Sequence, residues 1–181
     1  MKRDFFRKAW YFIWYDDSLL SWLVNVIIAF ILVKFIIYPG IGFLFGTTHP
    51  LVAVVSCSME HNTNFDDWWT KRGKWYEENK IPKEEFNKFP FKNGINQGDI
   101  MVLKKGNKVD IGDVIVFTGN QNPIIHRVVE KNNGFRTKGD NNSTPDGITN
   151  NVIGEAFFRI PYLGWIKIAF NGLIGQGIVK C

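Results

Sequence analysis

The feature that most constrains this chain is an uninterrupted apolar run near its N-terminus. Between Ser18 and Tyr38 the sequence reads SLLSWLVNVIIAFILVKFIIY. About twenty mostly apolar residues are what a helix needs to cross the hydrocarbon core of a bilayer. Asn25 lies within the run, and Lys34 is close enough to its end for the side chain to reach the interface. We therefore predict a single transmembrane helix at 18–38.

A cleaved secretory signal is the alternative interpretation of this run. The apolar core of such a signal has about 7–15 residues and precedes a cleavage site with small residues. The run here is longer, and the Tyr-Pro-Gly sequence at its end has no small-x-small pattern. We therefore expect the run to remain in the protein as an anchor.

The segment before the run, residues 1–17, is basic and aromatic. Its basic residues are Lys2, Arg3, Arg7 and Lys8. Basic and aromatic residues together suit a short helix on a membrane surface, and a disordered basic tail is the alternative. Because basic flanking residues favour the cytoplasmic side, we expect a cytoplasmic N-terminus and an extracytoplasmic domain formed by residues 39–181.

The composition limits what else the chain can contain. A length of 181 residues suits one ordinary domain beside an anchor. The 22 lysines and arginines exceed the 17 aspartates and glutamates, but they are scattered, whereas nucleic-acid binders gather basic residues in a stripe. We therefore expect a lipid bilayer and no nucleic acid among the partners. Cys57 and Cys181 lie far apart, so their spacing predicts neither a disulfide framework nor a metal site.

Beyond the anchor, the sequence contains short β-prone runs separated by turn residues. The runs are LVAVVS, DIMVL, DVIVF, PIIHRVVE and NVIGEAFFRI, a pattern typical of an all-β domain. Residues 62–96 interrupt the pattern with a polar and aromatic stretch that looks partly helical, and we interpret them as an insertion. Residues 157–181 are apolar but broken by Pro161, which favours an interfacial or packed segment over a second span. We predict a mainly β catalytic domain with an N-terminal transmembrane helix and a partly helical insertion.

A serine hydrolase needs a nucleophile, a base, a group that orients the base, and donors for the oxyanion. Four residues are candidates for the first three roles. Ser58 follows the first β-prone run, and His126 lies within another. Asp140 and Asp146 flank a turn-rich loop. Each residue alone has a commoner structural interpretation, namely a turn serine, a buried histidine, or a carboxylate in an Asx-turn.

Two other histidines compete with His126 as the base. His49 lies beside a proline before the first β-prone run, and His61 lies three residues after Ser58. A histidine so close to the nucleophile would require the local chain to fold back on itself. His126 is therefore the preferred base.

The short motifs around these residues resemble those of type I signal peptidases. The motifs are Ser56-Cys57-Ser58-Met59-Glu60, Gly98-Asp99-Ile100-Met101-Val102, Gly112-Asp113-Val114-Ile115-Val116-Phe117, His126-Arg127 and Lys138-Gly139-Asp140-Asn141-Asn142. Each motif alone is unspecific, but their order behind one anchor is specific, and the resemblance covers residues 52–146. It implies a serine endopeptidase that removes signal peptides from secretory precursors.

The resemblance also implies a role for each candidate residue. The serine next to the methionine is the nucleophile of the family, here Ser58, and His126 holds the place of the lysine base of the bacterial branch. A histidine at that place is typical of the archaeal and endoplasmic-reticulum branch, in which a carboxylate in or after the GDNN loop is essential. The match by spacing is Asp146, with Asp140 as a supporting acid. Ser56 matches the position whose hydroxyl assists the oxyanion in bacterial members.

The same resemblance implies partners and a location. The substrates would be secretory preproteins with small residues, commonly Ala-x-Ala, at the cleavage site, and the translocation machinery would be a further partner. No metal and no organic cofactor are implied. We expect a single-pass protein of an archaeal cell membrane rather than of the endoplasmic reticulum. Two departures from the family are His61, which replaces a frequent proline, and the insertion at 62–96, which compact bacterial members lack.

Two other functions fit parts of the sequence. A membrane-tethered β-domain that binds an exported partner without catalysis would explain the anchor and the strands, but not the Ser, His and Asp pattern. A related serine protease that only processes itself would explain that pattern. Reaction with an acylating probe separates the first from a protease, and cleavage of a precursor in trans excludes the second.

Overall fold

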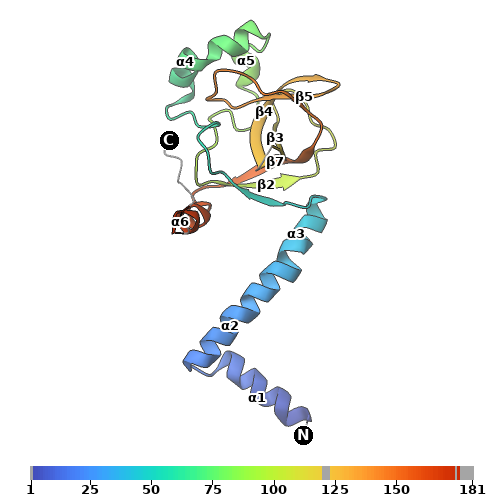
Figure 1. Cartoon of the computed structure of the whole chain (residues 1–181), viewed down its shortest axis with the longest axis vertical. Coiled ribbons are helices and arrows are strands. Elements are labelled where there is room, and N and C mark those ends of the chain that lie inside the picture. The colour runs from blue at the N-terminus through green and yellow to red at the C-terminus, as the bar shows by residue number, and fades with distance from the viewer. Residues whose placement is uncertain (1, 120–122, 174, 176–181) are drawn as a thin grey trace. The chain divides into compact units, whose positions relative to one another are not determined.

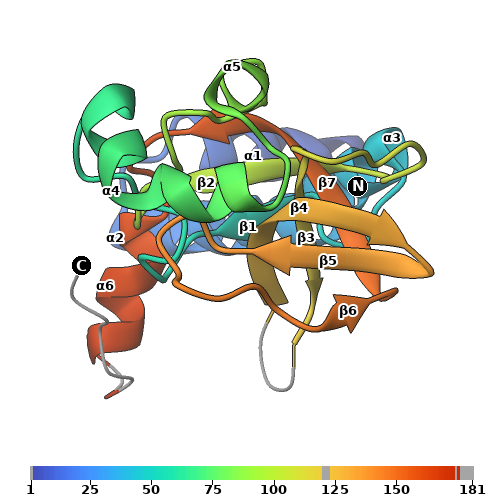
Figure 2. The same ribbon diagram turned by 90° about the horizontal axis from the view of Figure 1, so that it is seen from above.

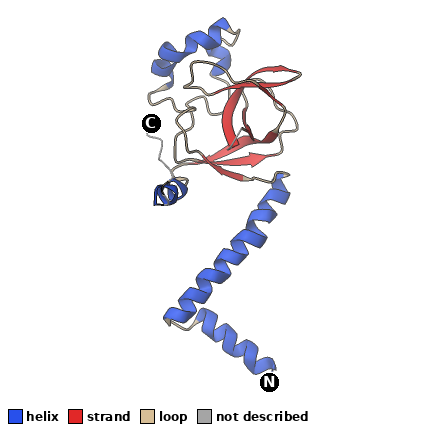
Figure 3. Cartoon of the chain, viewed as in Figure 1, coloured by secondary structure: helices blue, strands red, loops and turns tan. Residues whose placement is uncertain are grey.

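The computed structural model describes residues 2–119, 123–173 and 175 of the chain. The chain divides into two compact units, one ending at Leu44 and the other beginning at Phe45. Figure 1 labels the elements of each unit, and Figure 3 separates the helical from the β parts. The first unit is helical, and the second contains the sheet.

The first unit contains an N-terminal helix and a long apolar helix. The N-terminal helix is α1 (Lys2–Trp14). The long helix consists of α2 (Leu19–Leu32), a π-helical turn (Val33–Ile37) and α3 (Tyr38–Phe45). Together these 27 residues are long and apolar enough to cross a membrane. The helix therefore fits membrane anchoring.

The long helix continues past Tyr38, where the sequence predicted the end of the span. The backbone N–H of Tyr38 bonds to the carbonyl oxygen of Val33, one residue further back than in an α-helix. Such a π-helical turn just before Pro39 is one way to accommodate a residue that lacks an N–H and crowds the preceding turn. Asn25 donates its side-chain amide to the carbonyl oxygen of Ile13, 2.9 Å away, and so satisfies a backbone acceptor at the end of α1.

The second unit is built on an antiparallel sheet with the strand order β1-β2-β7-β3-β4-β5-β6. Figure 2 shows how the sheet curls. The strands are β1 (Leu51–Ala53), β2 (Ile100–Lys104), β3 (Val114–Thr118), β4 (Pro123–Asn132), β5 (Gly134–Lys138), β6 (Ile148–Thr149) and β7 (Val152–Ile160). The five β-prone runs of the sequence correspond to β1, β2, β3, β4 and β7.

The curl of the sheet buries both faces of β3. Val114 and Val116 belong to one apolar cluster, whereas Ile115 and Phe117 belong to another. Alternate residues of a strand point to opposite faces, so a continuous apolar run is what a strand covered on both faces requires. His126 pairs with Ile115 in the register of β3 and β4. The candidate base is therefore carried by a strand in the centre of the fold.

The insertion contains two helices that cover part of the sheet. They are α4 (Phe65–Glu78) and α5 (Lys83–Phe86). Their aromatic residues pack against Val129 of β4. This aromatic cluster consists of Trp68, Trp69, Tyr76, Ile81, Phe86 and Val129, with Phe65, Trp75 and Phe89 at its margin. A mainly β domain with an N-terminal apolar helix and a partly helical insertion confirms the fold class that the sequence predicted.

The C-terminal apolar segment begins within β7 and continues into a short helix, α6 (Trp165–Leu173). Trp165 lies against Gly98, where a side chain on the glycine would collide with the indole ring. Ile168 is buried, whereas Ile166 and Phe170 are exposed. α6 is therefore amphipathic and packs on the domain along one side. Residue 174 and residues 176–181 of the predicted segment lie outside the described residues.

Candidate active site

Ser58 lies in a tight turn that follows β1. The turn is closed by a hydrogen bond from the N–H of Glu60 to the carbonyl oxygen of Cys57, at 3.1 Å. Met59 is fully buried in the core and anchors the turn. The hydroxyl of Ser58 lies 3.2 Å from the hydroxyl of Ser56. The structure thus places the predicted nucleophile and the predicted oxyanion residue side by side.

His126 and Asp146 form a hydrogen-bonded pair. His126 on β4 is 6% exposed, and its Nδ1 lies 2.6 Å from Asp146 Oδ2. The same carboxylate oxygen accepts the hydroxyl of Thr137 at 2.7 Å. Burial alone would raise the pKa of Asp146, but the hydrogen bonds from His126 and Thr137 outweigh it and lower the pKa. Because an ionised carboxylate only accepts, His126 Nδ1 carries the proton, and in the neutral ring Nε2 is an acceptor.

Gly139 lies between this pair and the Ser58 turn. A Cβ atom on this glycine would lie 2.8 Å from His126 Nε2 and 2.8 Å from the carbonyl oxygen of Ser58. The base and the turn therefore approach each other at a residue without a side chain. Asn141 donates its N–H to the same carbonyl oxygen at 2.8 Å. Within the described residues, Ser58 Oγ is bonded to Ser56 and not to His126, and catalytic hydrogen bonds often form only when substrate binds.

Asp140 is not part of this pair but the centre of a separate buried network. Its carboxylate is fully buried and accepts two bonds from Arg127, through Nε at 2.9 Å and Nη2 at 2.8 Å. The hydroxyl of Tyr76 donates to Oδ1 at 2.9 Å, and His61 Nε2 lies 3.0 Å from Oδ2. Burial raises the pKa of Asp140, but the charge of Arg127 and the hydrogen bonds from His61 and Arg127 lower it overall. The carboxylate is therefore ionised and structural in character.

The two competing histidines are engaged elsewhere. His61 stacks on Trp68 with ring centroids 3.7 Å apart and planes 2° apart, and its Nε2 faces Asp140. His49 Nδ1 lies 2.9 Å from the hydroxyl of the neighbouring Thr48 in an exposed position. Neither histidine therefore faces the Ser58 turn, whereas His126 Nε2 and the Ser58 carbonyl both lie against Gly139.

Three residues of this region had no predicted role in the sequence. Thr137 binds the carboxylate of Asp146, and Tyr76 binds that of Asp140. Lys138 is buried, with its Nζ 4.7 Å from the centroid of the Tyr76 ring. Burial lowers the pKa of Lys138 to about 8, although the charge of Asp140 partly opposes the shift. In the sequence, only the position of Thr137 and Lys138 next to the GDNN motif pointed to the site, and nothing pointed to Tyr76.

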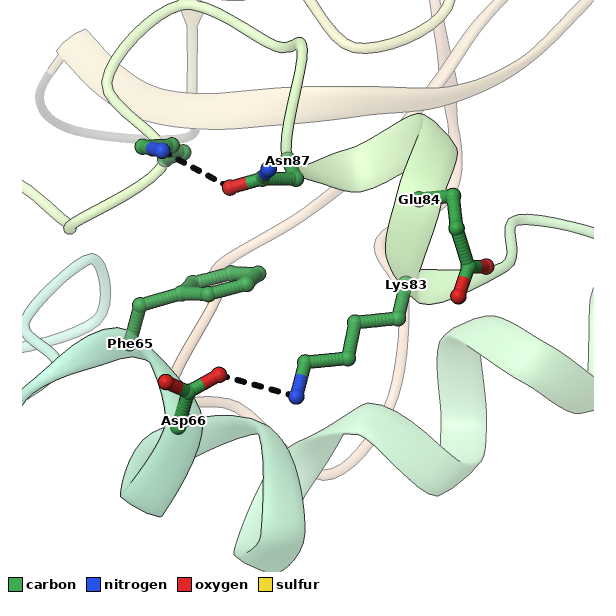
Figure 4. Close-up of a pocket in the computed structure, with 6 residues that line it drawn as sticks. Phe65, Asp66, Lys83, Glu84 and Asn87 are labelled. Carbon is green, nitrogen blue, oxygen red and sulfur yellow. Dashed lines mark hydrogen bonds and ion pairs between the residues drawn. The ribbon is translucent and has the colours of Figure 1, made fainter.

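A pocket on the insertion is separate from these residues. It is lined by Phe65, Asp66, Lys83, Glu84, Asn87 and Lys92, and Figure 4 labels the first five. Lys83 Nζ lies 2.8 Å from Asp66 Oδ1 and so ties α5 to the start of α4. Among the described residues, no group of three or more His, Cys, Asp or Glu side chains is placed to hold a metal ion.

Comparison with known families supports a class for the protein. A family model described as Peptidase S24-like matches residues 91–157, which is less than half of the chain. His126, Asp140 and Asp146 lie inside the matched region, and Ser58 lies outside it. This match, on a curled antiparallel sheet, supports a peptidase.

Similarity to individual proteins narrows the class. The chain is 25% identical over 175 residues to the signal peptidase complex catalytic subunit sec11 of Neurospora crassa, covering 80% of this chain and 83% of the relative. It is 28% identical over 155 residues to the subunit SEC11C of Homo sapiens, covering 75% of this chain and 64% of the relative, which is just under two thirds of that protein. Identity to sec11 of Schizosaccharomyces pombe is 29% over 151 residues, 72% of each chain. With the matched peptidase domain, these relatives support a type I signal peptidase of the endoplasmic-reticulum type. They give no support to the expected preference for an archaeal membrane.

Proposed function

We propose that this chain is a membrane-anchored serine endopeptidase that removes N-terminal signal peptides from secretory precursors. Ser58 is the nucleophile, His126 the general base and Asp146 the acid that orients the base. The observation that carries the proposal is the bond between His126 Nδ1 and Asp146, because it leaves Nε2 as an acceptor beside the Ser58 turn. The names of the relatives support the class of substrate.

In the proposed reaction, Ser58 Oγ forms a bond to the scissile carbonyl carbon while its proton passes to His126 Nε2. A rotation of the Ser58 side chain away from Ser56 would bring the hydroxyl to the base. Collapse of the tetrahedral intermediate breaks the C–N bond, and the imidazolium gives its proton to the leaving amine. Water, deprotonated by the same imidazole, then hydrolyses the acyl-enzyme. Asp146 stabilises the imidazolium in both steps.

The oxyanion would be bound by the backbone N–H of Ser58 and the hydroxyl of Ser56. The Ser56 hydroxyl lies 3.2 Å from the Ser58 hydroxyl. It is therefore close enough to reach the oxygen of a carbonyl that Ser58 attacks. Asp140 supports the site indirectly, because it holds Arg127, the residue next to the base on β4.

An extended substrate would bind along the edge of the sheet that precedes Ser58. β1 is an edge strand of the described sheet, and Val55, between β1 and the turn, is 43% exposed. A peptide that adds to a strand edge gains backbone hydrogen bonds and presents alternate side chains to the protein. This mode suits the segment around a signal-peptide cleavage site, because its side chains are small and its backbone is extended.

The covalent link to the long helix keeps the nucleophile near the membrane. Ser58 follows the last helical residue, Phe45, by about a dozen residues, and a fully extended chain covers about 3.5 Å per residue. Ser58 therefore lies within about 45 Å of the end of the helix in any arrangement of the two units. In the proposed orientation, residues 1–17 remain on the cytoplasmic side and the domain is outside or in the lumen.

The deciding experiment is cleavage of a model preprotein with an Ala-x-Ala site by the purified full chain in detergent. Wild type should release a product whose N-terminus begins after that site, and Ser58→Ala should release none while it unfolds at the same denaturant concentration. Ser143→Ala is the matched control, because this serine is exposed and has no role in the proposed reaction. Near-normal cleavage by Ser58→Ala would end the proposal, and intact substrate with cleaved enzyme would indicate self-processing.

A further inference from the structure

The loop between β5 and β6, residues 139–147, contacts both the base and the Ser58 turn of the proposed site. Its first residue, Gly139, lies against His126 Nε2 and the Ser58 carbonyl. Asn141 holds that carbonyl through its N–H, and Asp146 holds the base. The position of this β5–β6 loop therefore sets the distance between nucleophile and base.

Asp140 ties the β5–β6 loop to the interior of the domain. Each of its carboxylate oxygens has two hydrogen-bonding partners. These are Arg127 Nε and Tyr76 Oη on Oδ1, and Arg127 Nη2 and His61 Nε2 on Oδ2. A carboxylate has about four acceptor positions, so the set is complete. Arg127 supplies two of the four bonds from β4, and the other two come from Tyr76 and His61.

These two donors belong to the insertion and to the position just before it. Tyr76 lies on α4 and is fully buried in the aromatic cluster. The ring of His61 is held by stacking on Trp68 of the same helix. The insertion and His61 therefore meet at one carboxylate.

α4 also contacts the residue that precedes the β5–β6 loop. Lys138 Nζ lies 4.7 Å from the ring centroid of Tyr76 and 5.1 Å from that of Trp75, a geometry in which a cation is attracted to the ring face. It also donates to the carbonyl oxygen of Gly139 at 3.2 Å. The start of the loop is therefore held by the same helix on both sides of Gly139.

We propose that Tyr76 and His61 are positioning residues of the reaction, and that the insertion acts through them and Asp140 to hold the β5–β6 loop against the Ser58 turn. The inference rests on the proposed roles of Ser58, His126 and Asp146. Neither positioning residue contacts the substrate. Their loss would let the loop move, so that Ser58 and His126 reach a reactive distance less often.

The protonation states suit these roles. Burial and the charge of Asp140 raise the pKa of Tyr76 well above its usual value, so the phenol keeps its proton and donates. The pKa of Asp140 is lowered, so its carboxylate accepts at neutral pH. The bond from Tyr76 therefore runs to a charged acceptor, and such bonds are stronger than those between neutral groups.

The test compares Tyr76→Phe with wild type in precursor cleavage by the full chain. The substitution removes one oxygen and keeps the ring. We expect kcat to fall about tenfold, the effect of roughly one charged hydrogen bond, with KM within about twofold because binding of substrate is untouched. The rate at which an acylating probe labels Ser58 should fall by the same factor.

Two further variants separate positioning from general loss of stability. Trp69→Phe removes a hydrogen bond to Glu77 within the same aromatic cluster but none to Asp140, and should lower the unfolding midpoint with kcat unchanged. His61→Phe keeps an aromatic ring on Trp68 without a donor and should lower kcat, whereas His61→Gln retains a donor and should recover part of it. Unchanged kcat in Tyr76→Phe would overturn the inference, and so would a loss of kcat in Trp69→Phe equal to that in Tyr76→Phe. In either case an inactive Ser58→Ala variant would still support the proposed reaction.

Discussion

The same substitution at the two aspartates of the β5–β6 loop should impair different properties of the protein. Asp146→Asn removes a charge from a side chain that is 27% exposed and holds two hydrogen-bond donors. Asp140→Asn removes a charge from a fully buried side chain that faces the fully buried Arg127. The first substitution should affect mainly the reaction, whereas the second should affect mainly the fold and, through the position of the β5–β6 loop, also the reaction.

The magnitudes follow from these surroundings. In Asp146→Asn the amide no longer stabilises an imidazolium, and if its NH2 faces His126 the ring must carry its proton on Nε2, where it cannot accept from Ser58. We expect kcat to fall about 10²- to 10⁴-fold, with less than about 1 kcal/mol lost in unfolding free energy. In Asp140→Asn the guanidinium is left buried without its counter-charge, and breaking such a pair costs about 3–5 kcal/mol.

The assay combines single-turnover cleavage with denaturant unfolding of the full chain in detergent. Cleavage is measured with enzyme in excess, so that the rate reports chemistry rather than product release, and is corrected for the folded fraction. Asp146→Asn should be folded and nearly inactive, and Asp140→Asn should unfold at a clearly lower denaturant concentration. A folded, inactive Asp140→Asn beside an Asp146→Asn variant that keeps more than about a tenth of the rate would refute the assignment of the acid.

Two more substitutions test the immediate surroundings of the site. Gly139→Ala should lower kcat at least about 100-fold in precursor cleavage, because the new methyl group would lie 2.8 Å from both His126 Nε2 and the Ser58 carbonyl; near-normal cleavage would contradict this close approach. Lys138 has its pKa lowered to about 8 in the folded protein, so between pH 8 and 10 the unfolded chain binds more protons and stability should rise with pH by about 2 kcal/mol. Guanidinium unfolding should find this rise weakened in Lys138→Met, and parallel pH profiles for the two proteins would count against it.

The sequence predicted β1, β2, β3, β4 and β7 because each lies within an apolar run. β3 is a continuous apolar run, and β4 combines such a run with His126. β5 and β6 were not predicted, because GFRTK is a short mixed segment and β6 has only two residues. Both depend on pairing with their neighbours, β5 with β4 and β6 with β5, and a single-sequence pattern does not record such pairing.

For the site, the residues alone did not distinguish the two aspartates, and only the family resemblance preferred Asp146 to Asp140. Asp140 and Asp146 lie in one loop of similar composition, and only the fold directs one to Arg127 and the other to His126. The role of His61 was hidden for the same reason. His61 stood out only as a competing base and as a replacement for a proline, because the helix that supplies its stacking partner had no assigned place against the sheet.

The stacking of His61 on α4 sets a condition for building chimeras of this protein. Removing residues 62–96 alone would strip Trp68 from one face of the His61 ring and the Tyr76 hydroxyl from the carboxylate it binds, and would uncover Val129 on β4. Grafting the insertion into a compact homologue that has proline at this position would supply the helix without its second donor. The segment and residue 61 should therefore be exchanged as one module, from position 61 to position 96.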